Sequence, residues 1–152
     1  MESRIQQVID NHNSGCNCSQ SIFVTYYDLF QGIQNGDVAK RLSLAFGGGL
    51  ARTQGVCGAV CGSAMLLGLK YSPGSKAAAE EIWEFHELVR SFMKDFEEEN
   101  GSVYCRDIVR SDITTPEAYL NAHGNMEQYC PKAIVSAAKL LEEKYKIMEE
   151  SR

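Results

Sequence analysis

The sequence lacks three features that would place a small protein in a functional class at once. It has no basic excess, because 15 Lys and Arg stand against 20 Asp and Glu and give a formal net charge of −5. A general nucleic-acid binder usually carries a basic face. The most apolar run, residues 56–69, contains three glycines and is shorter than the roughly 18 residues of a membrane-spanning helix. Residues 1–7 are polar and lack the apolar core of a signal peptide. We therefore predict a cytoplasmic protein with neither nucleic-acid nor membrane partners.

Several cysteine and glycine motifs are also missing. No Cys-x-x-Cys pair occurs, which argues against a thioredoxin-type site and the usual zinc knuckles. No Cys-x-x-Cys-His occurs either, so covalent haem attachment is not indicated. The run Gly47-Gly48-Gly49 matches neither the P-loop nor the dinucleotide-binding fingerprint. We predict that this run is a tight turn, and that it and Gly58 let a neighbouring backbone or a cofactor approach closely.

What the sequence does have is the composition of one folded domain. Hydrophobic residues make up 44% and charged residues 23% of 152 positions, which is enough for a core in a single domain over residues 1–152. The alternation of apolar and polar residues that marks strands is absent, whereas apolar residues recur at helical spacings. We predict an all-α bundle of about six to eight helices, with the glycine turn before a central cysteine-containing helix.

Turn residues and capping signals divide the chain into the expected helices. Asp37, Ser75 and Ser102 are candidate N-caps, Thr115 before Pro116 is a further start signal, and Gly101 and Gly124 are candidate stops. In the longest helix the apolar side chains step by helical spacings and predict a buried stripe, namely Ile82, Phe85, Val89, Phe92 and Phe96. The expected helices cover residues 2–13, 18–30, 37–46, 55–70, 75–100, 102–111, 115–124 and 130–152.

Six cysteines are the most informative residues in the chain. In a reducing cytosol stable disulfides are rare, so cysteines that are more than core filler serve metals or redox chemistry. Four of them fall at expected helix starts: Cys18, Cys57, Cys105 and Cys130, the last directly before Pro131. A helix N-terminus favours an anion and lowers the pKa of a thiol. If these starts converge, they form an electropositive pocket lined by thiolates, so the four are candidate redox thiols and metal ligands.

The other two cysteines lie outside this set. Cys61 follows Cys57 by four residues, a spacing at which helical Cβ atoms lie about 5–6 Å apart, whereas a disulfide requires about 3.5–4.5 Å. A Cys57–Cys61 disulfide is therefore disfavoured relative to shared ligation of one metal. Cys16 lies two residues before Cys18 and is a spare ligand, a resolving thiol or a loop residue. We keep Cys16 and Cys61 as candidate resolving thiols, and Cys61 also as a further metal ligand.

With these residues in place, the sequence resembles a family of redox-active proteins named for its cysteine pattern, C-GCAxxG-C-C. The resemblance covers roughly residues 17–141 and rests on Asn17-Cys18-Ser19-Gln20, Phe46 to Gly49, Cys57 to Gly62, Cys105-Arg106 and Cys130. The central signature here begins Cys57-Gly58-Ala59, with its first two letters transposed. The resemblance implies an all-helical fold and a redox role. A domain of similar type in a multihaem cytochrome with iron–sulfur clusters implies a candidate cluster here, without the haems.

Two functions of different classes follow from these observations. The first is a redox or electron-transfer protein, a thiol- or metal-dependent oxidoreductase. In it, the four cysteines at helix starts either hold an iron–sulfur cluster or another metal, or cycle as disulfides. The second is a helical interaction or scaffold module whose cysteines are buried without redox chemistry, helped by the small residues Gly58, Ala59 and Gly62. The sequence identifies no substrate and no redox partner, and it leaves a homo-oligomer as an open alternative.

Overall fold

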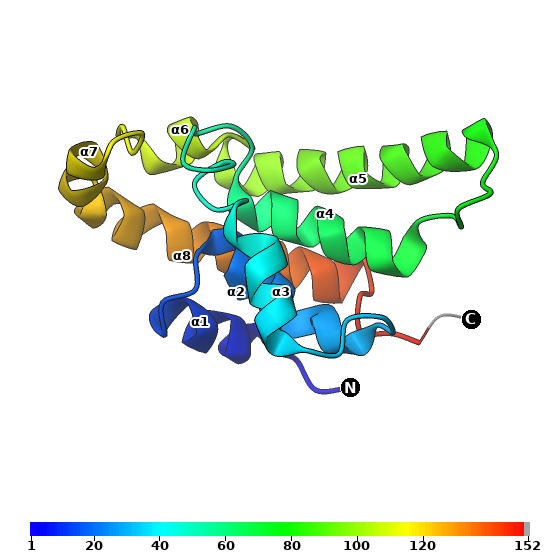
Figure 1. Cartoon of the computed structure of the whole chain (residues 1–152). Helices are drawn as coiled ribbons and strands as arrows, with labels where there is room; N and C mark the ends of the chain where they lie inside the picture. The colour runs from blue at the N-terminus through cyan, green and yellow to red at the C-terminus, as the bar shows by residue number, and fades with distance from the viewer. Residues whose placement is uncertain (151–152) are drawn as a thin grey trace.

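The computed structural model describes residues 1–150, and in this range eight α-helices and two short helical turns form the fold, without paired strands. The α-helices are α1 (Ile5–Asn13), α2 (Cys18–Tyr26), α3 (Gly36–Leu44), α4 (Gly58–Tyr71), α5 (Ala79–Asn100), α6 (Cys105–Val109), α7 (Pro116–Asn121) and α8 (His123–Lys139). Figure 1 shows α4, α5 and α8 lying along the long axis, with α1, α2 and α3 gathered on one side. The predicted all-α class and number of helices are confirmed.

Two predicted boundary signals work as expected. The Thr115 hydroxyl accepts a hydrogen bond from the Ala118 N–H at 3.1 Å, and Pro116 takes the first position of α7. Proline suits this position because the N–H that it lacks would have no helical partner there. At the other boundary, Gly101 ends α5 with a left-handed backbone, φ 83°, which glycine adopts without a steric penalty.

Two other helices begin at residues that the sequence does not predict. Helix α3 starts at Gly36, because the Asn35 side chain accepts a hydrogen bond from the Asp37 N–H at 2.8 Å and so replaces Asp37 as the cap. Helix α5 starts after Ala78 and not near Ser75. There the Glu81 carboxylate accepts from the Ala78 N–H at 2.7 Å. In both helices, the side chain that satisfies an unpaired N–H decides the boundary.

The predicted start of the last helix is wrong. Helix α8 begins at His123 and passes through Pro131, so Gly124 does not end a helix and Cys130 does not cap one. Proline is usually confined to the first turn because it lacks an N–H and crowds the preceding turn. Here apolar residues on both sides of Pro131 pack against the buried core, and this packing keeps the helix continuous.

The predicted end of that helix is also wrong. Helix α8 ends at Lys139 and is followed by a π-helical turn at Leu140–Lys144. Beyond this turn, the backbone of Lys146 is left-handed, with φ 52°. Leu141 and Ile147, which flank this bend, are both buried. The chain therefore turns back onto the core here, because burying Ile147 requires the change of direction.

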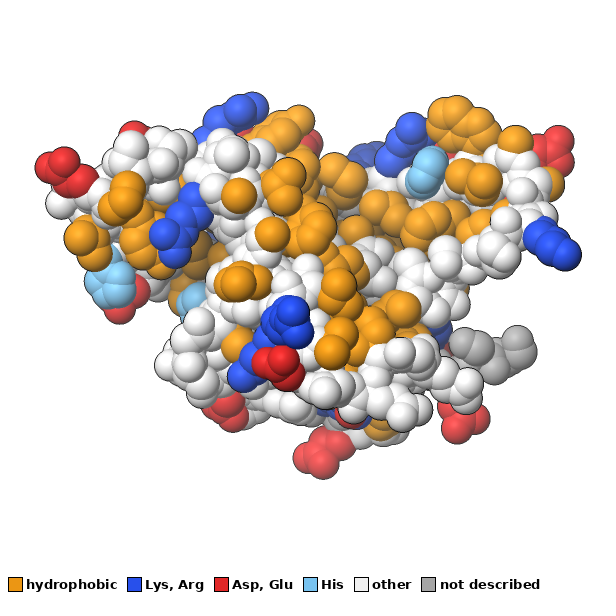
Figure 2. Space-filling model, viewed as in Figure 1, with side chains coloured by type: hydrophobic (Ala, Val, Ile, Leu, Met, Phe, Trp, Pro, Cys, Tyr) orange, Lys and Arg blue, Asp and Glu red, His pale blue; other side chains and the backbone are white. Residues whose placement is uncertain are grey.

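The predicted buried stripe of α5 is correct only in its second half. Phe92 and Phe96 are buried, but Ile82 is 43% exposed, and the other members of the stripe are half-buried. We call residues 68–71 of α4 and 79–90 of α5 the α4–α5 arm. Figure 2 shows apolar side chains at the surface along this end of the molecule. Helical spacing decides which residues share a face, but another element must cover that face to bury it.

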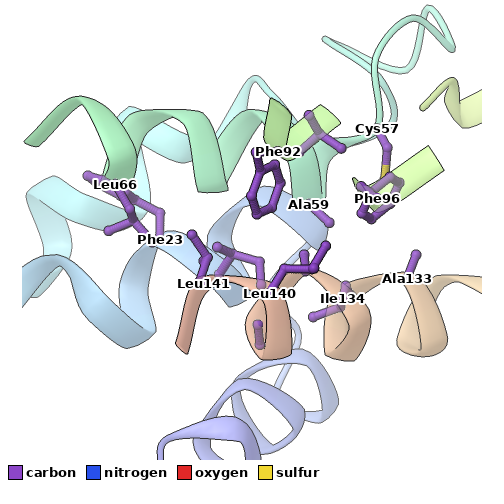
Figure 3. Close-up of a cluster of buried hydrophobic side chains, with 14 of the residues drawn as sticks. Phe23, Cys57, Ala59, Leu66, Phe92, Phe96, Ala133, Ile134, Leu140 and Leu141 are labelled. Carbon is purple, nitrogen blue, oxygen red and sulfur yellow. The ribbon is translucent and has the colours of Figure 1, made fainter. Parts of the chain in front are cut away.

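The core lies where α2, α4, α5 and α8 meet. Helix α2 is enclosed on most sides, and its Ile22 and Tyr26 are fully buried. Figure 3 shows Phe92 and Phe96 of α5 directed into the cluster of buried side chains, to which Cys57 also belongs. The core therefore reaches one of the cysteines of interest. No helix within residues 1–150 combines the length and apolarity needed to cross a membrane.

Candidate functional site

Cys18 is the first residue of α2, as predicted. The Asn17 side chain accepts a hydrogen bond from the Gln20 N–H, and the Gln20 side chain accepts one from the Asn17 N–H, both at 3.0 Å. The Asn17 amide also donates to the carbonyl of Leu44 at 2.8 Å, and the Gly48 N–H donates to the Cys18 sulfur. The capping residue thus fastens the start of α2 to the glycine turn.

Cys57 and Cys105 are held next to each other by a single backbone bridge between Val56 and Tyr104. The N–H groups of Cys57 and Cys105 each donate to a carbonyl across this bridge at 2.7 Å. Because each cysteine directly follows a bridge residue, both side chains project from the same face of the pair. Cys57 is then the N-cap residue of α4, and Cys105 is the first residue of α6.

Ser102 does not cap α6, contrary to the prediction. Tyr104 holds the N-cap position. The Ser102 hydroxyl instead accepts a hydrogen bond from the Tyr104 N–H at 3.0 Å and donates to the Asp107 carboxylate at 2.7 Å. Ser102 therefore orders the backbone that approaches Cys105.

The four cysteines expected at helix starts lie together, with Cys18 at their centre. The Cys18 and Cys130 thiols lie close enough to interact directly, and Cys57 and Cys105 lie near enough for a charge on Cys18 to raise the pKa of each. The helix-start position is confirmed for three of them and wrong for Cys130, which reaches the same place from the middle of α8. Convergence therefore does not depend on the shared helix-start location.

Protonated thiols are favoured at this site. The interaction with Cys130 and burial raise the pKa of Cys18 well above its usual value, and burial and the charge of Cys18 do the same for the pKa of Cys57. Burial and Cys18 raise the pKa of Cys105 to about 12. Backbone N–H groups at the glycine turn and at the start of α4 oppose these shifts only in part. The expected lowering of thiol pKa at helix N-termini is therefore outweighed by burial.

Cys61 and Cys16 lie apart from this group in different ways. The Cys61 thiol donates to the carbonyl of Val56 at 3.6 Å, and burial alone raises the pKa of Cys61. Cys16 is half-buried, and its carbonyl oxygen lies 3.1 Å from His12 Nδ1. The resolving role of both cysteines stays a prediction, as does the role of Cys61 as a further ligand.

Glycines of α4 set the distance between α4 and α2. A Cβ at Gly58 would lie 3.1 Å from the Cβ of Cys18, and a Cβ at Gly62 would lie 2.7 Å from the carbonyl oxygen of Ser19. At Gly47 a Cβ would lie 2.3 Å from Nδ2 of Asn17. Any side chain at these positions would push α2 away and move Cys18 with it. The close approach seen here is between parts of the chain, and a role of these glycines toward a cofactor stays a prediction.

The segment between α3 and α4 contains a turn of left-handed backbone. Residues 48–52 all have positive φ, between 52° and 70°. Leu50, Ala51 and Arg52 carry side chains, and each costs about 1–2 kcal/mol in this conformation. Strain of this kind persists only where the surrounding structure enforces it, and it is concentrated at functional sites. Only the glycines at the start of this turn are a sequence signal for it.

A buried glutamine fastens this turn to the segment that follows α6. The Gln54 side chain donates to the carbonyl of Ser111 at 2.8 Å and accepts from the Ile113 N–H at 3.4 Å. Gln54 is itself left-handed, with φ 62°, and its side chain satisfies two backbone groups that would otherwise be buried without partners. Nothing in the local sequence indicates this link, because its ends are far apart along the chain.

A cavity of about 940 Å³ opens beside the cysteines, and four of them line it: Cys16, Cys18, Cys105 and Cys130. Cys57 is buried in the core behind it. Two further lining residues, Arg52 and Tyr119, stack with the guanidinium carbon 3.8 Å from the ring centre. This contact joins the left-handed turn to α7 at the wall of the cavity, and sequence reasoning missed it.

A scan against protein-family models matches residues 16–144 to the family described as "Putative redox-active protein (C_GCAxxG_C_C)". The chain belongs to the C_GCAxxG_C_C family. Searches of curated proteins and of solved structures return no match. The family's description is the source of the term redox-active. The arrangement of the thiols in this protein comes from its own structure.

The donor set of this C_GCAxxG_C_C protein has the residue type and the number of ligands that iron–sulfur clusters use. Within residues 1–150, no three His, Cys, Asp or Glu side chains surround one point as a bound ion requires. Four cysteines are the usual ligand number of an iron–sulfur cluster, in which different cysteines bind different irons. The residues that could hold such a cluster are Cys18, Cys57, Cys105 and Cys130.

Proposed function

We propose that this protein transfers electrons through a centre formed by Cys18, Cys57, Cys105 and Cys130. The observation that carries the proposal is the proximity of the Cys18 thiol to the other three, which come from α4, α6 and α8. Cysteines kept only for packing need no such convergence, since a buried thiol packs as a small apolar group anywhere in a core. Membership of a family described as redox-active supports the same function.

The raised pKa values support a role of the four cysteines as ligands of an iron–sulfur cluster. Protonated thiols release their protons when a cation replaces them, so the site is stable without the cluster and ionises on loading. The backbone N–H groups of Gly48 and Ala59 lie close to the sulfurs of Cys18 and Cys57 and would remain as donors to bound thiolates. A cluster held in this way supplies one-electron transfer at a potential set by charge, hydrogen bonds and exposure.

The cysteines divide the site into a dry side and an open side. Cys57 belongs to the main core cluster and does not line the cavity, whereas Cys18, Cys105 and Cys130 do. The core excludes water behind Cys57 and lowers the local dielectric, which tunes the potential of a centre. The cavity leaves the other side within reach of a reaction partner.

A second function, thiol–disulfide exchange, is favoured by the closeness of Cys18 and Cys130, which interact and line the same cavity. In this reaction the Cys18 thiolate attacks a disulfide of a protein partner, one partner sulfur leaves, and Cys130 then displaces the other. The Cys18–Cys130 pair loses two electrons and two protons, which the partner disulfide gains to become two thiols. We rank this function second, because the raised pKa of Cys18 makes little thiolate available at neutral pH.

Spectroscopy and metal analysis of protein purified under nitrogen test the first function. We expect bound iron, acid-labile sulfide and visible absorbance. All three should fall to background in Cys57→Ser and in Cys105→Ser, which remove proposed ligands. Cys61→Ser is the matched control from the same helix region, and it should retain the centre, because the Cys61 thiol donates to the carbonyl of Val56 and does not line the cavity.

Two other outcomes would overturn this function. A colourless, iron-free protein whose thiols oxidise in pairs would replace the cluster by thiol–disulfide exchange. A colourless protein with six unreactive thiols would contradict any redox function and leave the helical scaffold module.

A further inference from the structure

Helix α3 is attached to the rest of the protein by a narrow strip. Only Ala39 and Ser43 of its nine residues are buried, and α3 packs against α2. Val38, Leu42 and Leu44 are 40%, 52% and 59% exposed. Single exposed apolar residues are ordinary, but several large ones side by side mark an interaction surface.

The same surface continues onto the left-handed turn. The Ala51 N–H donates to the carbonyl of Ala45, just after α3, at 2.6 Å, and Leu50 in this turn is 51% exposed. The strained backbone thus presents Leu50 to solvent near the end of α3. We call the exposed side of α3 together with Leu50 the α3 face. It carries Val38 and Leu42 on one flank of the helix, Lys40 and Leu44 on the other, and Arg41 and Asp37 between them. Figure 2 shows apolar and basic side chains together over α3 and the loop above it.

The charge around the α3 face is opposite in sign to that of the protein. Residues 36–54 contain Lys40, Arg41 and Arg52 against Asp37, a net of 3 − 1 = +2, whereas the whole chain carries −5. Lys40 and Arg41 are exposed, and neither forms an ion pair with an acidic side chain in the described part of the chain. Basic side chains around an exposed apolar centre attract an acidic surface and orient it.

The segment that carries the α3 face is joined to the start of α2, where Cys18 lies. The carbonyl of Lys40 accepts a hydrogen bond from the Gln20 side chain at 3.0 Å, which joins the middle of α3 to the first turn of α2. The Gly48 N–H donates to the Cys18 sulfur from the turn that carries Leu50. A molecule docked on the α3 face would therefore contact the segment that holds the start of α2, where Cys18 lies.

We propose that the α3 face docks an acidic electron-carrier protein, which passes one electron at a time to or from the four-cysteine centre. The electron transfer rests on the proposed function, whereas the docking rests on the α3 face alone. Electron-carrier complexes are short-lived and bury less than about 1,200 Å², so a small apolar centre with a basic rim is sufficient. The basic rim steers the encounter, and the exposed leucines lose water on contact.

Calorimetric titration with an acidic plant-type ferredoxin tests the docking. We expect binding that weakens between about 20 mM and about 200 mM salt, because the steering charges are exposed. The double variant Lys40→Glu with Arg41→Glu should weaken binding about tenfold at the lower salt. Leu42→Ser should weaken it about threefold at both salts, since the lost contribution is apolar.

A charge-matched control separates the α3 face from net charge. The double variant Lys94→Glu with Lys139→Glu changes two exposed lysines on α5 and α8 and therefore alters the total charge by the same amount. We expect less than about a twofold change in ferredoxin affinity for this control. Circular dichroism shows whether each variant keeps its helices. A basic cytochrome c is the opposite probe, and its binding should not weaken in the Lys40→Glu and Arg41→Glu variant.

The outcomes distinguish the docking from the centre. Equal loss of ferredoxin affinity in both double variants, or no loss in either, would overturn the α3 face. The titration is repeated on reduced, iron-free protein, because docking requires no centre. Binding that persists while the iron and thiol tests fail would keep the α3 face and remove the proposed function. An iron-loaded protein that does not bind ferredoxin would overturn the docking alone.

Discussion

The cysteine end of the molecule and the α4–α5 arm share α4, yet they are packed in different ways. At the cysteine end, Gly58 and Gly62 bring the α4 backbone against α2, so that an added Cβ would meet main-chain atoms within 3.1 Å. At the arm, a Cβ on Gly68 would meet only the tip of Phe85, at 3.8 Å. Ile82 there remains 43% exposed. The fold therefore fixes atomic positions tightly at one end and leaves the other open to change.

The largest expected contrast concerns thiol reactivity at the cysteine end. The pKa of Cys105 is raised from 9.0 to about 12, so its thiolate fraction at pH 7 is about a thousandfold below that of an ordinary thiol. In reduced, iron-free protein we expect the rate of Cys105 alkylation by iodoacetamide to rise from pH 7 up to about pH 12. Peptide mass spectrometry measures this rate. In denaturant the alkylation rate should stop rising near pH 9. If the rate in the folded protein also stops rising near pH 9, the Cys105 thiol is exposed to solvent and the prediction is wrong.

The same shift predicts the direction of the pH dependence of stability. The folded state disfavours the Cys105 thiolate, so the stability contributed by this thiol is present below about pH 9 and is lost as the pH rises toward about 12. Denaturant unfolding of iron-free protein should show a lower free energy of unfolding at about pH 10.5 than at about pH 8. Cys105→Ser should reduce this difference, and an unchanged difference would assign it to other groups.

Truncations along α5 test the contrast on one helix. Phe92→Ala should cost about 3–5 kcal/mol, because Phe92 is fully buried. Ile82→Ala should cost less than about 1 kcal/mol, because Ile82 keeps much of its contact with water. Urea unfolding measures both. Similar losses would mean that the arm is covered in solution, as it would be in a homo-oligomer, and sedimentation would then show a larger species.

Alanine substitutions along α4 test the glycine packing. Gly62→Ala should destabilise the fold by about 1–3 kcal/mol, because its Cβ would meet the Ser19 carbonyl oxygen at 2.7 Å. Gly68→Ala, the matched change in the arm, should stabilise the fold by up to about 1 kcal/mol, because alanine favours helix and space is available. Thermal unfolding reports both signs, and equal effects would contradict the difference between the two ends.

The smallest expected effect concerns the left-handed turn. Ala51→Gly should stabilise the protein by about 0.5–1 kcal/mol, because glycine relieves the strain at φ 52° while losing more chain entropy on folding. Ala64→Gly in α4 should destabilise it by about 1 kcal/mol, because that residue is helical. Denaturant unfolding measures the free energy of unfolding of both variants, and the two Ala→Gly substitutions should change it in opposite directions. Destabilisation by both would show that Ala51 is unstrained.

The predictable parts of the fold depend on local chemistry. Helical spacing of apolar residues gives the all-α class, and Thr115 and Gly101 mark helix ends through hydrogen bonds and φ angles that neighbouring residues determine. The positions of Cys18 and Cys57 at helix starts follow from the same signals. Because these cysteines stand at ends that can be recognised locally, the candidate site could be identified before the fold.

The unpredicted parts depend on packing between distant segments. Pro131 stays inside α8 because flanking residues are buried, so Cys130 could not be placed from the proline rule. Leu50 and Ala51 carry no sequence signal for left-handed backbone, which the surrounding contacts enforce. The thiol pKa values are raised, although the helix N-termini predicted that they would be lowered. The N-terminus can be recognised from nearby residues, whereas burial depends on the whole fold.

The contact between Cys18 and Cys130 has a consequence for the order of events in the cell. The two residues are 130 − 18 = 112 positions apart in the chain, so the first thiol leaves the ribosome long before the last one is translated. Cys18, Cys57 and Cys105 are therefore synthesised before Cys130, and the four thiols come together only when α8 is made and packs against the other helices. The set of four thiols is therefore complete only after α8 has been made, and a product truncated before α8 would leave Cys18, Cys57 and Cys105 without Cys130.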